Sequence, residues 1–199
     1  MFRCVFDVDG VLLDFESTYI RALTEYFQLE IPDDYEPQSW FFSELLTEEQ
    51  MKEGWQFFLQ SDYFAQMPPL VDPEGFNQLV GAYPVHCVTN IPPECLDRRR
   101  ENLRNVGFRV DSSHCGGFIE YAGHPRQTKA EVVQELMEPA ESLVFIDDHP
   151  DNCLNILEYF PDAEIWLMSR PFNREFHDER ILRAKTWDDV FINSRLAHS

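Results

Sequence analysis

The sequence is poor in basic residues and lacks a long apolar run. Its 199 residues include 36 Asp and Glu but only 16 Lys and Arg, which gives a formal net charge of −20. A surface of this sign repels the phosphate backbone of nucleic acids, so we expect no nucleic-acid partner. No stretch approaches the roughly 20 consecutive apolar residues of a transmembrane helix, so we expect no membrane partner either.

Cysteine is present but lacks the spacing of a structural site. The five cysteines are odd in number and include no Cys-x-x-Cys pair, which fits neither a disulfide framework nor a zinc site. The first residues also become acidic too early for a signal peptide. We therefore expect a cytoplasmic protein. Monomer and homodimer both remain open.

Four short apolar runs predict buried parallel strands, and helical patterns lie between them. The strands are expected at residues 2–6, 84–88, 142–146 and 163–168. Helices are expected at residues 15–27, 93–106 and 151–159, and after capping boxes that begin at Thr47 and Thr128. This alternation predicts an α/β fold with a Rossmann-like open parallel sheet.

The segment between the first two strands is far longer than one crossover helix. It is rich in aromatic residues and carries helical patterns. We therefore expect residues 1–14 and 81–199 to form the α/β core. Residues 15–80 are expected to form a small helical cap inserted after the first strand.

Polar side chains follow three of the predicted strands, where ligands bind in open α/β sheets. These side chains are Asp7 and Asp9, Thr89 and Asn90, and Asp147 and Asp148. Lys129 joins them because its capping box places it in the first turn of a helix. We expect all of these groups to converge at one edge of the sheet.

The residue types suit phosphoryl transfer. Clustered carboxylates repel one another unless a cation lies between them, and a hard oxygen cluster suits Mg²⁺. Asp7 could attack phosphorus to form an acyl phosphate, while Asp9 could protonate the leaving oxygen and then activate water. Thr89 and Lys129 offer a hydroxyl, a backbone N–H and a positive charge to the transferring group. Gly10 allows the chain to turn sharply after the acids.

The ordered set of motifs resembles the haloacid dehalogenase (HAD) superfamily. The motifs are Asp-Val-Asp-Gly-Val at residues 7–11, then Thr89-Asn90, Lys129 and Asp147-Asp148, so the resemblance spans most of the chain. It implies a HAD-like core and a phosphatase that hydrolyses a phosphoric monoester of a small phosphorylated metabolite.

The same resemblance implies roles for individual residues. Asp7 would be the nucleophile and Asp9 the general acid and base, while Thr89, Asn90 and Lys129 would hold the phosphoryl group. The Asp7 side chain, the Asp9 backbone carbonyl and an acid of the last motif would hold Mg²⁺. We favour Asp148 as that acid, with Asp147 or Asp151 in support.

A narrower resemblance links the chain to the 5'(3')-deoxyribonucleotidases. It rests on residues 7–16, on an aromatic-rich cap, and on residues 61–64 and 67–70. It implies a (deoxy)nucleoside monophosphate as substrate, with its base stacked on aromatic rings. The matching substrate-binding positions are Phe15, Trp40, Phe41, Trp55 and Phe64. The second motif, residues 89–93, is closer to the superfamily at large, so another small phosphometabolite remains an alternative.

Two other function classes compete with a phosphatase. Phosphoaspartate receiver domains in signalling also cluster acids, Thr and Lys around Mg²⁺, but they resemble this chain less because their acidic pair comes first. The second competing class is a scaffold protein of the same fold without catalytic activity. Within the superfamily, dehalogenases have no need for a second acid such as Asp9.

Two further residue clusters have simpler interpretations. Residues 98–100, Arg-Arg-Arg, are expected to form a solvated helix face. Trp55 and Phe58 share one helix face, so core packing explains them more readily than ligand binding does.

Overall fold

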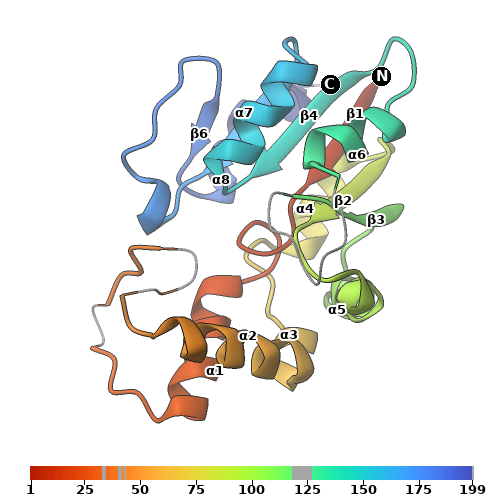
Figure 1. Cartoon of the computed structure of the whole chain (residues 1–199). Helices are drawn as coiled ribbons and strands as arrows, with labels where there is room; N and C mark the ends of the chain where they lie inside the picture. Colours follow the sequence, from red (N-terminus) through yellow and green to blue (C-terminus); the bar gives the residue numbers. More distant parts are fainter. Residues whose placement is uncertain (33–34, 40–41, 43, 118–126, 199) are drawn as a thin grey trace.

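The computed structural model describes residues 1–32, 35–39, 42, 44–117 and 127–198, and a parallel sheet forms its centre. The strands are β1 (Phe2–Phe6), β2 (Val85–Thr89), β3 (Ser112–Cys115), β4 (Ser142–Asp147), β5 (Glu164–Met168) and β6 (Leu182–Ala184). They lie in the order β3-β2-β1-β4-β5-β6, and all the pairs are parallel (Figure 1). The predicted Rossmann-like open parallel sheet is confirmed.

Helices alternate with these strands. The α-helices are α1 (Phe15–Phe27), α2 (Glu48–Gln60), α3 (Asp62–Ala65), α4 (Pro73–Val80), α5 (Leu96–Val106), α6 (Lys129–Leu136), α7 (Pro150–Tyr159) and α8 (Trp187–Asn193). The 3-10 helices are η1 (Pro93–Cys95), η2 (Pro171–Asn173) and η3 (Arg195–His198). None of the described helices combines the length and apolar character that crossing a membrane requires.

The sheet buries a core on each of its faces. Successive side chains of a strand point to opposite faces. Phe6 of β1 packs against Phe76 of α4 and Trp187 of α8, with ring centroids 5.0 and 6.1 Å apart. Its neighbour Val5 belongs to a second core with Val133 of α6. With both faces covered, the carboxyl ends of the strands are left to form a site.

Helices α1, α2 and α3 lie beyond the carboxyl ends of the strands (Figure 1). The α1 helix begins where Asp14 accepts a hydrogen bond from the Ser17 backbone N–H at 3.2 Å. Aromatic rings hold α1 to α2, and Tyr19 packs edge-on against Phe58 at 4.9 Å. This arrangement suits a cap, although the exact division at residues 15–80 stays a prediction.

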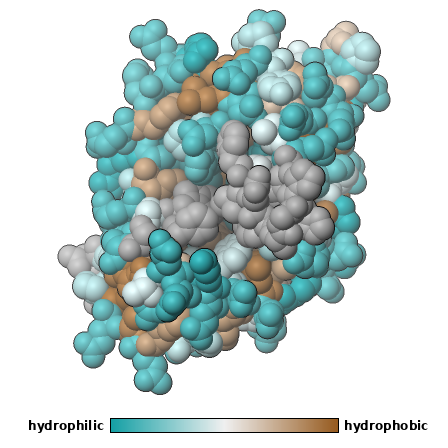
Figure 2. Space-filling model, in the orientation of Figure 1, coloured by the Kyte–Doolittle hydropathy of each residue, from teal (hydrophilic) through white to brown (hydrophobic). Residues whose placement is uncertain are grey.

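The face of the molecule in Figure 2 is mostly polar. Hydrophilic side chains cover most of the face in Figure 2, and hydrophobic ones form small patches among them. Scattered apolar residues of this kind are ordinary on a folded protein.

Several short elements of the described structure, among them β3, β6 and α4, were not predicted. The edge strand β3 reads Ser-Ser-His-Cys, and β6 has only three residues, so neither carries an apolar run. The helix α4 begins with Pro73 at its first position and is eight residues long. Short elements at the margin of a core give weak periodicity, because few of their side chains must be buried.

Candidate active site

Two carboxylates lie side by side because of the register between β1 and β4. Phe6 pairs with Ile146, so Asp7 and Asp147 come next in their strands together. The Asp7 backbone N–H donates to the Ile146 carbonyl oxygen at 2.9 Å, which extends the ladder to this point. Both side chains are buried. The central strands of the sheet therefore deliver two acids to one place.

Lys129 bridges these two acids. Its Nζ atom lies 2.9 Å from Asp7 Oδ2 and 2.8 Å from Asp147 Oδ2, and its side chain is fully buried. It is the first residue of α6, where the capping box of Thr128 and Glu131 fixes the start of the helix. Burial acts to lower the pKa of Lys129, but Asp147 and Asp7 outweigh it and raise the pKa. Lys129 is therefore a charged group shared by two carboxylates.

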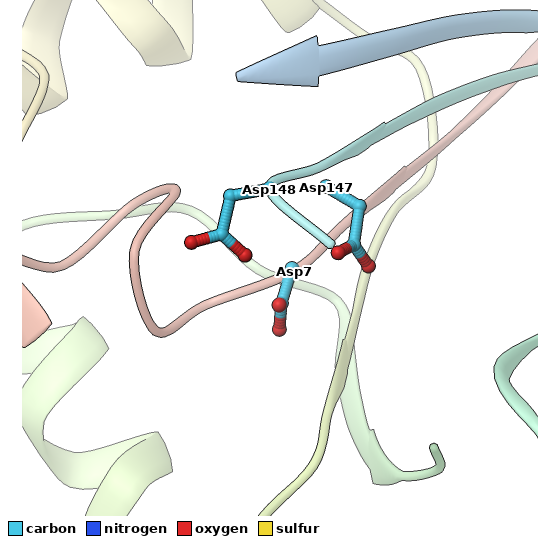
Figure 3. Close-up of side chains that lie close together, drawn as sticks. All are labelled: Asp7, Asp147 and Asp148. Carbon is cyan, nitrogen blue, oxygen red and sulfur yellow. The ribbon is translucent and has the colours of Figure 1, made fainter. Parts of the chain in front are cut away.

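Asp148 completes an acidic cluster at the end of β4. One carboxylate oxygen from each of Asp7, Asp147 and Asp148 lies within 4.8 Å of the other two (Figure 3). Gly10 leaves the necessary room, because a Cβ atom there would lie 2.1 Å from Asp148 Oδ2. Its φ of +82° also favours glycine.

Hydrogen bonds already occupy both oxygens of Asp147. Oδ1 accepts from the His149 backbone N–H at 2.8 Å and from Asn152 Nδ2 at 3.1 Å. Oδ2 accepts from Lys129 Nζ at 2.8 Å. Asp147 is thus placed to hold Lys129 and the turn into α7.

Asp148 has more capacity left for a cation. Its Oδ1 atom is buried and makes no hydrogen bond within the described part of the chain. Its Oδ2 atom lies 3.9 Å from Arg170 Nε, beyond hydrogen-bond distance. Asp151, by contrast, is exposed and lies outside the cluster. A buried carboxylate with an unsatisfied oxygen, beside Asp7, fits a hard divalent cation such as Mg²⁺.

The electrostatics of the cluster also fit a cation. Burial raises the pKa of Asp7 to about 7, although Lys129 opposes the shift. Burial, followed by the charges of Asp7 and Asp147, raises the pKa of Asp148 well above its ordinary range. Both shifts reflect the cost of burying negative charge, and a bound divalent cation removes that cost.

Asp9 points to a different set of partners. Its Oδ1 atom lies 3.1 Å from Arg99 Nη2, and its Oδ2 atom is 3.5 Å from Thr89 Oγ1, a long contact. Burial raises the pKa of Asp9, and the charge of Arg99 opposes the rise. The Asp9 side chain is not part of the three-carboxylate cluster found among the described residues.

The position of Arg99 corrects the prediction of a solvated arginine face. Arg99 is fully buried and forms an ion pair with Asp9. A signal for this was present in the sequence, because Leu96, Arg99 and Leu103 follow one another at helical spacing. Arg99 therefore occupies the apolar stripe of α5 and faces the core.

Thr89 and Asn90 lie at the end of β2, beside the end of β1. Thr89 is fully buried and Asn90 is half-buried. The Asn90 side chain contacts the loop after β3, where a Cβ atom at Gly117 would lie 2.6 Å from Asn90 Cγ. The structure thus brings both predicted phosphate-binding residues to the same edge as Asp7 and Lys129.

The predicted base-stacking residues have different surroundings. Phe15 is buried, stacks on Tyr19 with ring centroids 5.1 Å apart, and meets Trp55 edge-on at 6.2 Å. Phe64 is fully buried, with the Arg99 guanidinium 3.9 Å from its ring centroid and Phe58 on its edge. Trp40 and Phe41 lie outside the described residues.

A small cavity lies beside the acids. Asp148 and Arg170, which follow β4 and β5, line it together with Phe15, Glu16 and Phe42 from the segment between β1 and β2. Its volume is about 10 Å³, room for about one water molecule. Of the predicted aromatic residues that the structure describes, Phe15 is thus the one that reaches this cavity.

Arg170 is a site residue that the sequence patterns did not predict. It follows β5 and donates a hydrogen bond to the Gly10 carbonyl oxygen, and its guanidinium lies near Asp148. The available signal was its place just beyond a predicted strand, where the acids of the other strands were recognised.

Comparisons with known proteins identify the fold. No family model matches the chain, and no curated protein matches it in sequence. Among solved structures, it is similar to a haloacid dehalogenase-like hydrolase from Streptococcus pneumoniae, with 17% identity and a TM-score of 0.60 over 96% of this chain and 98% of that one. It is also similar to YfnB of Bacillus subtilis, described as a HAD hydrolase bound to magnesium, with 13% identity and a TM-score of 0.59 over 96% and 97%.

An L-2-haloacid dehalogenase from Xanthobacter autotrophicus is similar as well. It shares 13% identity, with a TM-score of 0.50 over 84% of this chain and 78% of that one. At such identities the likeness concerns the fold, which hosts more than one chemistry. The parallel sheet, the acids at its strand ends and these comparisons agree that the chain has the fold of the HAD-superfamily hydrolases.

Proposed function

We propose that the protein is a Mg²⁺-dependent phosphatase that hydrolyses phosphoric monoesters through an aspartyl-phosphate on Asp7. The observation that carries this proposal is the buried cluster of Asp7, Asp147 and Asp148 with Lys129 bound to two of them. Lys129 contacts Asp7 and Asp147, so the carboxylate of Asp148 is the member of the cluster available to a cation. This arrangement combines a nucleophile, a metal site and a positive charge for phosphate.

Asp7 and Asp9 would carry the covalent steps. An Asp7 carboxylate oxygen attacks phosphorus, the bond from phosphorus to the ester oxygen breaks, and Asp9 donates a proton to the departing alcohol. Asp9 then takes a proton from water, which attacks the acyl phosphate and releases inorganic phosphate and free Asp7. The two acids stand two residues apart and have different partners, Lys129 and Arg99, which suits different roles.

Asp7 and Asp148 would hold Mg²⁺ together with the Asp9 backbone carbonyl, while Asp147 keeps Lys129 and α7 in place. When bound, the ion neutralises charge on the transferring phosphoryl group. Thr89, Asn90 and Lys129 would hold the phosphoryl oxygens, and their common place at the sheet edge supports this role.

Dehalogenation is the competing chemistry on this fold. A haloacid dehalogenase uses an aspartate in the place of Asp7 but has no need for Asp9 as an acid. Here Asp9 is buried and held by an arginine, and Asp148 has an unsatisfied oxygen. Both observations favour phosphoryl transfer.

The substrate would be a small phosphorylated metabolite. A (deoxy)nucleoside monophosphate is the first candidate, as the resemblance to the deoxyribonucleotidases implies. It is supported by the position of the aromatic Phe15, which faces Asp148 across the water-sized cavity. The alternative is another small phosphate ester. The five cysteines are free, which suits the proposed cytoplasmic location. Monomer and homodimer are equally compatible with this chemistry.

A signalling domain that keeps its phosphoaspartate is the alternative from another class. Its test is the lifetime of the acyl phosphate after addition of a small phosphoryl donor. Rapid loss with release of phosphate supports the phosphatase, and a long-lived acyl phosphate without turnover supports the signalling domain.

The decisive experiment measures inorganic phosphate released from a panel of phosphate monoesters, in Mg²⁺ and in EDTA. The panel includes deoxynucleoside, ribonucleoside and sugar phosphates, and a 2-haloacid tests dehalogenation. The Asp7→Asn variant is the blank. We expect Mg²⁺-dependent release that this variant abolishes. Full activity in EDTA, or in Asp7→Asn, contradicts the mechanism.

A further inference from the structure

Arg99 touches both the active site and the chain that returns from the cap. Its Nη2 atom lies 3.1 Å from Asp9 Oδ1. Its Nη1 atom donates to the Phe64 carbonyl oxygen at 2.8 Å, and its guanidinium lies 3.9 Å from the centroid of the Phe64 ring. Phe64 belongs to α3, the last helix before the chain re-enters the core. One fully buried side chain thus joins an acid of the site to the end of the cap.

Asn102 strengthens this junction one turn further along α5. Its Oδ1 atom accepts from Arg99 Nη1 and from the Met67 backbone N–H, both at 3.1 Å. Its Nδ2 atom donates to the Met67 carbonyl oxygen, also at 3.1 Å. Residues 64–67, which we call the return segment, are therefore docked on α5 through hydrogen bonds between their main chain and the Arg99 and Asn102 side chains.

The outgoing connection to the cap is paired with the returning one. The Asp14 backbone N–H donates to the Pro68 carbonyl oxygen at 2.9 Å, and the Leu70 N–H donates to the Leu12 carbonyl oxygen at 2.8 Å. The chain that follows the return segment is therefore joined by main-chain hydrogen bonds to the loop that follows Asp9. Arg99 contacts both parts of this connection, through its ion pair with Asp9 and its hydrogen bond to the Phe64 carbonyl oxygen.

We infer that Arg99 is a positioning residue for Asp9, which transmits the docking of the return segment to the carboxylate that acts as general acid. This inference rests on the proposed phosphatase function and adds to it a device that aligns the acid when the cap is docked. Among the described residues, the side-chain hydrogen bond that Asp9 accepts is the long one from Thr89, 3.5 Å from Oδ2, so the ion pair with Arg99 is the closer restraint.

Arg98 offers a matched control. Its Nη2 atom donates to the Ser61 carbonyl oxygen at 2.7 Å, it also binds the Leu59 carbonyl oxygen, and it lies 5.4 Å from the centroid of the Phe64 ring. Arg98 therefore ties the cap to α5, as Arg99 does, but within the described part of the chain its hydrogen bonds go to Leu59 and Ser61 rather than to Asp9.

The test uses two esters that differ in their need for an acid. In p-nitrophenyl phosphate the leaving group is a stable phenolate ion, which departs without a proton. In glycerol phosphate the leaving group is an alcohol, and its oxygen must be protonated as the bond to phosphorus breaks. We expect Arg99→Met to lower kcat on glycerol phosphate by about 10- to 100-fold, since general acids contribute about 100- to 10,000-fold in all. The fall on p-nitrophenyl phosphate should stay below about 3-fold. Arg98→Met should change both rates by the same factor.

A double-mutant cycle completes the experiment. If Arg99 acts through Asp9, adding Arg99→Met to the Asp9→Asn variant should not lower kcat on glycerol phosphate any further. The Tm is also measured for the wild type, for each single variant and for the double variant. The decrease in Tm of the double variant should be smaller than the sum of the decreases in the two single variants. An equal fall on both esters, or additive changes in the cycle, overturns the inference.

The two proposals fail in different ways. If the wild type releases phosphate from neither ester nor from the wider panel, the phosphatase assignment fails. The Tm cycle then still decides whether Arg99 and Asp9 are coupled. If the wild type is active but Arg99→Met behaves like Arg98→Met, the assignment stands and the positioning role is wrong.

Discussion

A Cβ atom at Gly10 would lie 2.1 Å from Asp148 Oδ2, well inside van der Waals contact. The turn after β1 therefore approaches the last acid of the cluster so closely that no side chain fits between them. This approach has a chemical consequence, since it sets the distance between Asp148 and the end of β1, where Asp7 lies.

Gly10→Ala should move the Asp148 carboxylate out of its position beside Asp7. The new methyl group displaces the carboxylate, and we expect a loss of at least about 100-fold in kcat/KM together with a higher Mg²⁺ requirement, as for a misplaced catalytic group. Gly107→Ala is the control, because Gly107 also has a positive φ, +103°, but the nearest atom to its Cβ would be Pro73 Cβ at 3.7 Å. Both variants should lose about 1–2 kcal/mol of stability from the left-handed backbone, and Gly10→Ala should lose more because its methyl group also displaces Asp148. Equal activity in the two variants contradicts the prediction.

Asp147 and Asp148 should respond differently to amide substitution. Asp148→Asn is expected to weaken Mg²⁺ binding by at least about 10-fold with little change in Tm, because it removes a proposed ligand charge. Asp147→Asn should instead lower the free energy of unfolding by about 3 kcal/mol, because it breaks the buried pair with Lys129. Calorimetric titration with Mg²⁺ and urea unfolding measure the two effects. The reverse pattern would make Asp147 the ligand.

The metal-free protein should lose stability as pH rises from about 4 to about 7. Burial raises the pKa of Asp7 to about 7 in the folded state, from 3.8. Between these two pKa values the folded state binds more protons than the unfolded state, so the free energy of unfolding falls with rising pH. A single group of this kind lowers that free energy by at most about 1.4 kcal/mol for each pH unit in the window.

Urea unfolding in EDTA at several pH values measures this slope. Asp7→Asn lacks the titrating group, so its slope over the same range should be smaller, while the rest of the acidic surface is unchanged. Added Mg²⁺ should flatten the wild-type slope because it favours the ionised carboxylates. An unchanged slope in Asp7→Asn would mean that Asp7 is not the group responsible.

Phe15→Leu tests the nucleotide assignment. If the Phe15 ring stacks on a base, its loss should raise KM for deoxynucleoside monophosphates by about 10-fold, since such stacking contributes about 1–3 kcal/mol. The kcat on p-nitrophenyl phosphate should change by less than about 3-fold. Phe58→Leu is the control, because Phe58 is fully buried in the same aromatic cluster but does not line the cavity. If Phe15→Leu and Phe58→Leu change KM for deoxynucleoside monophosphates equally, Phe15 does not stack on the base.

Some of the site could be predicted because strand ends carry their own signals. The apolar run at residues 2–6 ends at Asp7, and β1 occupies the same residues in the structure. The Thr128 capping box located the start of α6 and with it Lys129. Parallel strands then bring such residues to one edge by geometry alone.

Local patterns were enough to show that the acids, Thr89 and Lys129 reach that edge, because hydrophobic periodicity and helix caps depend on neighbours in the chain, but they did not reveal Arg170 or Arg99 there. How those residues divide the work depends on tertiary packing. Asp147 is occupied by Lys129 and Asn152 while Asp148 is not, and no local pattern distinguishes two adjacent aspartates. The burial of Arg99 against Asp9 is likewise non-local, joining residues 90 positions apart through packing that a charge pattern does not record.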